Sequence, residues 1–297
     1  MSISGITETR TNRSSDPASQ SASTTQFPQK RSLRELATKT LSAATVFWFV
    51  VTIIGQAFLF VYIISFYGRA VLGGDWLRVN KVLVAGYIRG DTMGNVALAI
   101  HLVIAAMITA SGPLQLMPKL RVRFPRFHRW NGRIYLSIAV ITSVVGSYMV
   151  WTRPIIGDLT QHIGTTSNAV VILLCVFFTL RHALAGQFAM HRRWALRLYL
   201  AVSGVWFFRV ALMFSLLVNR GAVGFNPDTF TGPFLSILSF AQYIVPLTVL
   251  EIYLRVKDKQ RPAAQLTTAA GIFVLTIAMG IGIFGAALMM WLPHIIK

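Results

Sequence analysis

The stretch "TTAAGIFVLTIAMGIGIFGAALMMWL", residues 267–292, runs without a single charged side chain. A transmembrane α-helix needs about 20 consecutive, mostly apolar residues to cross the hydrocarbon core of a bilayer. The lipid offers no water to backbone N–H and C=O groups, so such a segment satisfies them internally as a helix. This stretch therefore predicts a membrane-spanning helix.

The rest of the chain repeats this pattern. Of its 297 residues, 55% are hydrophobic and only 12% are charged, whereas a soluble domain carries about 25% charged residues. The short alternating strands of a membrane β-barrel are absent. We predict an all-α fold, a polytopic transmembrane helical bundle of about seven spans. The expected spans are Leu41–Phe66, Asn95–Met117, Ile134–Trp151, Ser167–Arg181, Leu198–Val218, Phe234–Tyr253 and Thr267–Leu292.

The distribution of positive charge predicts the topology. If the N-terminus is cytoplasmic, 20 of the 28 Lys and Arg residues fall in the N-terminal tail and inner loops, and 7 fall outside. This bias is the positive-inside rule, so we expect the N-terminus inside and the C-terminus outside, in the cell inner membrane. Anionic lipid headgroups of the bilayer are the expected partner of these charges. The net charge of +19 is thereby explained, and nucleic-acid binding is not expected.

The predicted domain organisation is simple. Residues 1–35 are polar and rich in Ser and Thr, so we expect a disordered cytoplasmic tail, followed by a membrane domain over residues 36–297. The only cysteine, Cys175, lies inside a span, which leaves no disulfide and no cysteine-based metal site. A Gly-x-Gly-x-x-Gly match, "GIGIFG" from Gly280 to Gly285, follows no strand and predicts close helix packing.

Two polar phrases in the chain resemble each other. "FHRWNGRIYL" occupies residues 127–136, and "MHRRWALRLYL" occupies residues 190–200 with Arg193 inserted. In the predicted topology each phrase precedes a helix that starts at the cytoplasmic face, the third and the fifth. This favours a repeated helical hairpin over about residues 95–215. Functional sites of membrane proteins often lie where such repeats meet.

The repeated phrase has two interpretations. Its Trp, Tyr and Arg residues are typical of anchoring at the membrane interface. Anchoring, however, does not require a histidine at the same place twice. We therefore single out His128 and His191, which are expected to face a common pocket on the cytoplasmic side.

A family resemblance rests on these residues. "HRWNGRIY" and "HRRWALR", together with His101, the "GPLQL" that begins at Gly112, and Arg209, resemble the paired motifs of a bacterial family of predicted multispanning membrane proteins. That family is catalogued as a domain of unknown function, and the resemblance covers about residues 95–215. It implies a class of membrane protein and no activity. The chain departs from the pattern at "HALAGQFA", residues 182–189, which argues against a special role for His182.

Ionisable residues inside a span are costly and suggest function. Arg209 is predicted within the fifth span and His101 within the second. Arg209 is either a structural hub that binds helix-end carbonyls or a counter-charge for an anionic group. His101 is a buried structural residue, a haem ligand or a proton-handling group. We expect both to share one layer with three amide side chains, Gln56, Asn168 and Gln242.

Three functions are compatible with these residues. The first is a b-type haem- or quinone-handling electron-transfer protein, because axial histidines in helical bundles hold haem b. The second is a transporter or channel for a small or anionic solute. The third is a non-catalytic partner of lipid or of a membrane subunit, with a homo-oligomer as another possible assembly. The candidate cofactor-binding residues are His101, His128, His191 and Arg209. No motif identifies an enzyme activity or a set of metal ligands.

Overall fold

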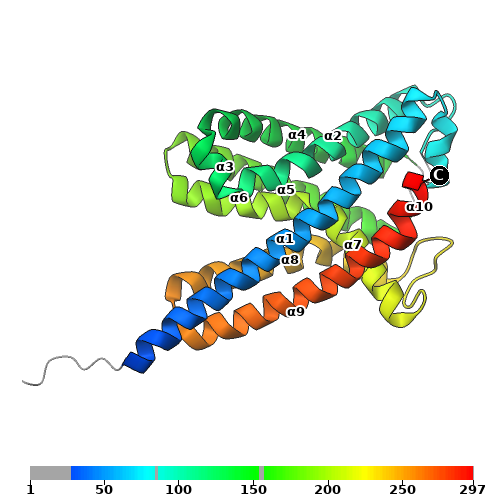
Figure 1. Cartoon of the computed structure of the whole chain (residues 1–297). Helices are drawn as coiled ribbons and strands as arrows, with labels where there is room; N and C mark the ends of the chain where they lie inside the picture. The colour runs from blue at the N-terminus through cyan, green and yellow to red at the C-terminus, as the bar shows by residue number, and fades with distance from the viewer. Residues whose placement is uncertain (1–27, 84–85, 154–156, 297) are drawn as a thin grey trace, which may run out of the picture.

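The computed structural model describes residues 28–83, 86–153 and 157–296 (Figure 1). All regular elements among these residues are helices. Apart from them, the described residues contain one isolated β-bridge, between Asn226 and Thr231, and no sheet. The long helices are α1 (Pro28–Leu72), α2 (Thr92–Leu116), α4 (Pro125–Thr152), α5 (Leu159–Leu184), α6 (Phe188–Val202), α7 (Gly204–Asn219), α8 (Pro233–Lys259) and α9 (Pro262–Ala286). Short helices are η2 (Trp76–Lys81), α3 (Pro118–Arg123), η3 (Ala287–Trp291) and α10 (Leu292–Ile296).

The helices match the predicted number of spans. Six of the described helices are long and apolar enough to cross a membrane, and α6 with α7 forms a seventh span that is bent by 51°. The predicted all-α bundle of about seven spans is confirmed. In Figure 1, the start of α1, the α3 helix and the start of α6 lie at one end of the bundle, and the C-terminus lies at the other.

Several boundaries differ from those expected. Residues 1–27 of the predicted disordered tail lie outside the described residues, but residues 28–35 already belong to α1. An ion pair of 2.7 Å between Glu35 and Lys39, one turn apart, supports this first part of the helix. The connection between α1 and α2 contains the short η2, and residues 84–85 are not described.

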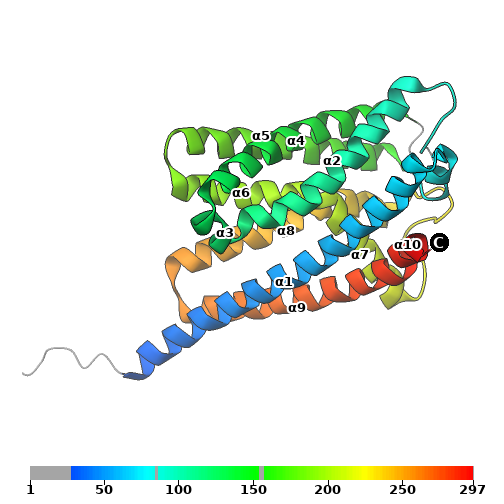
Figure 2. The same ribbon diagram turned by 45° about the horizontal axis from the view of Figure 1, so that its top comes forward.

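The helices form two groups (Figures 1 and 2). The hairpins α2–α4 and α5–α6 lie together as a four-helix bundle, and α1, α8 and α9 lie beside it. The bent span joins the groups, because α6 packs mainly on α5 whereas α7 packs on α9 and α8. The bend falls at the dipeptide Ser203–Gly204, a sequence that commonly kinks helices.

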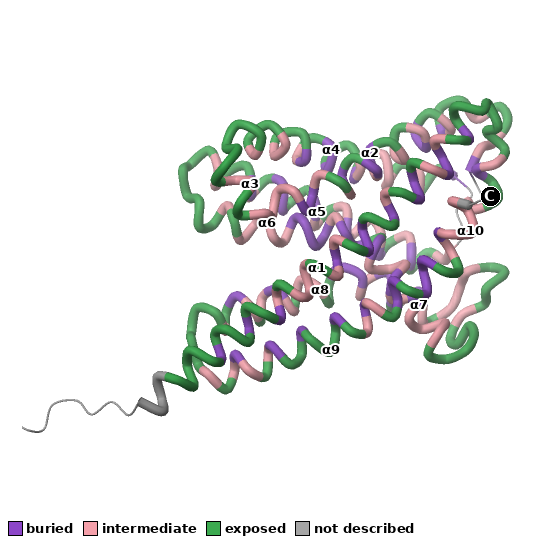
Figure 3. Tube along the Cα trace, in the orientation of Figure 1, coloured by how far each residue is buried: buried purple, intermediate pink, exposed green. Residues whose placement is uncertain are grey.

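Much of the outside of the bundle is exposed (Figure 3), and many of the exposed residues are large and apolar. On α9, for example, Val274 is 65% exposed and Phe284 is 61% exposed. Exposed apolar faces of this extent are unusual in a soluble protein but expected where lipid is the solvent. The described helices therefore support contact with a lipid bilayer.

Two polar anchors fix the end of the bundle that is predicted to lie outside. Arg153, which follows α4, is buried and donates hydrogen bonds to the carbonyl oxygens of Gly94 (2.9 Å) and Gly86 (3.0 Å). Asp158 caps α5 and also accepts a 2.8 Å hydrogen bond from the Ser236 hydroxyl of α8. These hydrogen bonds, above all that from the backbone N–H of Gln161, lower the pKa of the Asp158 carboxyl group.

The predicted topology can be tested with reporter fusions. An alkaline phosphatase fused at Gly157 should be active, because the α4–α5 connection is expected to face outside. The same reporter fused at Gln187, between α5 and α6, should be inactive because that turn is expected to be cytoplasmic. Phosphatase activity at Gln187 together with none at Gly157 would reverse the predicted orientation, and with it the side to which the His128 end of the bundle is assigned.

Candidate functional site

The two histidines of the repeated phrase lie at the same end of the four-helix bundle. His128 is in the first turn of α4, and His191 is in the first turn of α6. Both phrases are thus helical rather than preceding their helices, as the sequence suggested. The two imidazoles are close enough for their charges to interact. The structure therefore brings together the pair that the sequence placed at equal depth.

Hydrogen bonds from neighbouring helices position both histidines. The ring Nδ1 of His191 lies 3.0 Å from the carbonyl oxygen of Thr179 on α5. Because a carbonyl only accepts, Nδ1 carries the proton and leaves Nε2 as the acceptor. The Gln115 amide of α2 donates a 3.1 Å hydrogen bond to the backbone oxygen of His128. All four helices of the bundle therefore contribute to one layer.

This layer contains buried polar atoms that lack partners. They are the Nδ1 atom of His128, the Oε1 atom of Gln115 and the Oγ1 atom of Thr179, and none has a hydrogen-bond partner among the described residues. Buried polar atoms in native proteins are nearly always paired, and an exception calls for an unobserved water, an ion or a ligand. The His128–His191 layer is therefore the strongest candidate for a ligand site.

The next layer explains why the phrases also share a tyrosine. Tyr135 lies seven residues after His128, and Tyr199 lies eight after His191, two turns along each helix. Both rings pack on Gly112 of the "GPLQL" motif, where a Cβ atom would lie 3.1 Å from Tyr199 and 3.3 Å from Tyr135. Glycine at this position lets the two phrases meet across the bundle.

The family of the chain follows from the same residues. A family model described as a predicted membrane protein (DUF2306) matches residues 98–254, which include the two phrases, the glycine motif, His101 and Arg209. The chain belongs to the DUF2306 family. Comparison with curated proteins and with solved structures gives no match. The DUF2306 region begins within α2 and ends within α8, so it contains most of the four-helix bundle and the whole bent span.

The arginines of the second phrase bind α8 rather than lipid alone. Arg197 donates a 2.6 Å hydrogen bond to Glu251, and Arg193 forms 2.8 Å bonds to both carboxylate oxygens of Asp258. Arg197 also lies over the Trp194 ring at 4.8 Å. Arg193 and Arg197 therefore attach the four-helix bundle to α8, in addition to the interfacial anchoring that the sequence predicts for the phrase.

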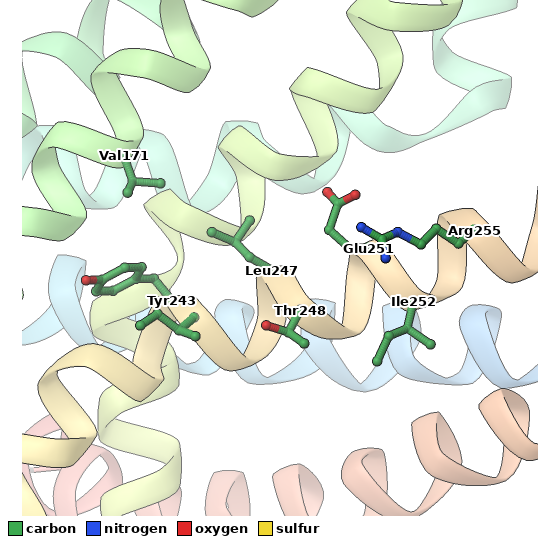
Figure 4. A pocket seen from close by; sticks show the side chains of 8 residues that line it. Val171, Tyr243, Leu247, Thr248, Glu251, Ile252 and Arg255 are labelled. Atoms are coloured by element: carbon green, nitrogen blue, oxygen red, sulfur yellow. The ribbon is translucent and has the colours of Figure 1, made fainter.

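A groove separates α5 from α8 beside this contact (Figure 4). It has a volume of about 510 Å³. Its walls are mainly aliphatic, and Glu251 and Arg255 lie toward one end. The residues labelled in Figure 4 are Val171, Tyr243, Leu247, Thr248, Glu251, Ile252 and Arg255. The groove is wide open and apolar, as expected for a lipid-facing surface.

The predicted polar layer divides into two groups. Gln56 donates to the Ser203 hydroxyl (3.1 Å), and Asn168 donates to the Ala201 carbonyl (3.1 Å), so these amides stabilise the broken backbone of the bent span. Gln242 is buried nearby, 3.6 Å from where a Cβ of Gly204 would lie. Each amide donates a hydrogen bond near the break, as expected for backbone that is not helical inside a membrane, whereas the Oδ1 atom of Asn168 has no partner among the described residues.

Arg209 and His101 form the second group. Arg209 lies six residues beyond Ser203, about 9 Å farther along α7. Its charge acts on His101 of α2 and on Tyr62 and Tyr67 of α1, so Arg209 lies within electrostatic range of both helices. None of the hydrogen bonds of the described residues joins Arg209 to the amides, and the single layer of five residues stays a prediction. Tyr62 and Tyr67 were not among the residues predicted for that layer.

Proposed function

We propose that this DUF2306 protein is a membrane-embedded electron-transfer protein that binds haem b between His128 and His191. The observation that carries the proposal is the His128–His191 pair itself. The two imidazoles come from different helices, are close enough for their charges to interact, and belong to a layer where three buried polar atoms lack partners among the described residues. Histidines projecting from facing helices are the usual ligands of haem in helical bundles.

The composition of the site favours haem over a bare metal ion. In the described part of the chain, no group of three or more His, Cys, Asp or Glu side chains is arranged to hold a metal. A zinc ion needs three or four protein ligands. A haem iron receives four nitrogen ligands from its porphyrin, so two histidines complete its coordination. A set of two histidines without a carboxylate therefore fits haem best.

The surroundings of the pair are also suitable. The hydrogen bond from His191 Nδ1 to the Thr179 carbonyl is the orienting contact that metal-binding histidines usually have. Arg121, whose charge acts on His128, supplies a cation for a haem propionate. The aromatic rings of Tyr135 and Tyr199 lie two turns farther along the same helices, where both pack on Gly112.

The proposal predicts the visible spectrum of the protein. Chain expressed with added haem precursor and purified in detergent should show the absorption bands of a low-spin haem, with one haem per chain. His128→Ala or His191→Ala should remove one axial ligand, which abolishes the low-spin bands and lowers the haem content several-fold. The measurement is the difference spectrum between dithionite-reduced and oxidised protein, with haem content measured as the pyridine complex.

His182→Ala is the matched control. His182 lies at the same end of the bundle, but its ring Nδ1 is only 2.6 Å from the Gln187 amide oxygen in its own turn. This variant should keep the full haem content. Circular dichroism and size-exclusion profiles show whether each variant is folded. A folded, haem-supplied wild type without haem bands, or equal haem content in all three variants, would contradict the proposal.

A further inference from the structure

A second unusual group lies away from the His128–His191 layer, around Arg209. Trp206 and Met213, one turn before and after Arg209 on α7, pack in one cluster with Tyr62 and Tyr67 of α1. The charge of Arg209 acts on both tyrosines and on His101 of α2. The surrounding cluster is mainly apolar and includes Trp206 and Phe66. A positive charge in such surroundings is costly unless an anion or a set of acceptors meets it.

No described residue supplies that partner. Arg209 has neither a hydrogen bond nor an ion pair within the described ranges, and the acidic Glu251 is engaged by Arg197 instead. The His101 Nδ1 atom is buried and has no hydrogen-bond partner among the described residues, and the buried Tyr62 hydroxyl interacts only with that of Tyr67. Polar groups from three helices therefore lie near one another with no acidic group to meet the charge of Arg209.

The position of Arg209 limits what could bind. It lies ten residues before the end of α7, which is about 15 Å along the helix. Its side chain is half-buried rather than enclosed, so a small molecule can touch it. A ligand must therefore be small, and it must carry acceptor oxygens because Arg209 and the Tyr62 hydroxyl are donors.

We propose that Arg209, Tyr62 and His101 form a binding site for a small anion with a carboxylate or phosphate-like group. The guanidinium fork matches two oxygens of such a group, and the Tyr62 hydroxyl donates to a remaining lone pair. Neutral His101 donates through Nδ1. A lipid phosphate has the same chemistry, but the depth of Arg209 favours a free anion over a headgroup. The site is separate from the histidine pair and does not depend on haem.

The experiment measures anion-dependent stability. Protein in a zwitterionic detergent is titrated with sodium phosphate or sodium acetate against chloride at constant ionic strength. The readouts are the thermal unfolding midpoint and the intrinsic tryptophan fluorescence, to which Trp206, one turn before Arg209, contributes together with six other tryptophans. We expect a saturable rise in the midpoint for at least one of the two anions. Arg209→Gln should weaken this binding at least about tenfold, since hydrogen bonds from a charged group are lost.

Two further variants separate binding from a structural role. Tyr62→Phe removes a buried hydroxyl that interacts only with that of Tyr67, so it should change the midpoint of the anion-free protein little while reducing the anion-induced rise. Arg220→Gln, at the exposed C-cap of α7, makes the same charge change and should preserve that rise. An equal rise in Arg209→Gln and Arg220→Gln, or no rise with phosphate, acetate or lipid, would overturn the site.

A second arm distinguishes the source of the anion. The same variants are compared in nanodiscs of phosphatidylglycerol and of phosphatidylcholine. If stabilisation that depends on Arg209 occurs only in phosphatidylglycerol, the site binds a lipid headgroup, and the choice of a free anion is wrong. If it occurs in phosphatidylcholine nanodiscs on adding phosphate or acetate, the free anion is supported.

Discussion

Arg153→Met is expected to destabilise the protein by about 3–5 kcal/mol, because it removes a buried charge around which one end of the bundle is organised. The Arg153 side chain is only 2% exposed. It donates to the carbonyl oxygens of Gly94 and Gly86 and to the Asn95 side chain (3.2 Å), and its Nε lies 3.5 Å from Asp91. Methionine fills similar space but leaves these acceptors without a donor.

The measurement is the thermal unfolding midpoint in detergent, together with protease sensitivity of the α1–α2 connection. Both should change, because Arg153 binds that connection through Gly86 as well as the start of α2. Arg89→Met is the matched control, since Arg89 is exposed in the same connection. Equal midpoints for the two variants would show that the buried contacts of Arg153 do not stabilise the bundle.

Arg153 also illustrates what the sequence could not predict. By the positive-inside rule, Arg153 is one of the few basic residues expected outside. Its place in the sequence, directly after a span, does not show whether its side chain points to water or into the protein. Its burial depends on carbonyl groups of α2 and of the preceding connection, which only the tertiary fold brings together. The one signal in the sequence was the rarity of basic residues on that side.

The spans themselves could be predicted because hydropathy accumulates over about 20 residues, so one polar residue changes little. The break at Ser203 is the opposite case. It depends on a single dipeptide whose amide and hydroxyl partners, such as Gln56, come from another helix. A Ser–Gly pair is a recognisable signal for a kink, but the sequence alone does not specify its angle of 51°.

The histidine pair shows an intermediate case. Counting residues from predicted span ends gave His128 and His191 the same depth, and the structure places both in first turns. Whether they approach each other depends on the order of helices around the bundle, which the sequence does not specify. In the structure, Tyr135 and Tyr199 both contact Gly112. This tertiary contact holds the two phrases side by side in one site.

Glycines of α9, within the apolar stretch 267–292, test how closely this helix packs against the bent span. Gly282→Ala is expected to destabilise the protein by at least about 1–3 kcal/mol, the usual cost of overpacking. A Cβ atom at Gly282 would overlap the carbonyl oxygen of Val210 and would lie 2.8 Å from the Cγ1 atom of the same valine. Because the overlap is with backbone, no side-chain rotation relieves it, and α7 must move away from α9.

Two neighbouring glycines give a graded control on the same helix. A Cβ at Gly285 would lie 2.6 Å from the Leu217 Cδ1, a side-chain end that can rotate, whereas at Gly280 nothing lies within 4 Å. Gly285→Ala should therefore cost less than Gly282→Ala, and Gly280→Ala should be neutral or stabilising because alanine favours a helix. Thermal midpoints and the yield of monodisperse protein measure the order. If Gly280→Ala is as damaging as Gly282→Ala, "GIGIFG" has a role other than helix packing. The expected order assigns the motif to the α7–α9 contact, which holds the Arg209 helix in place.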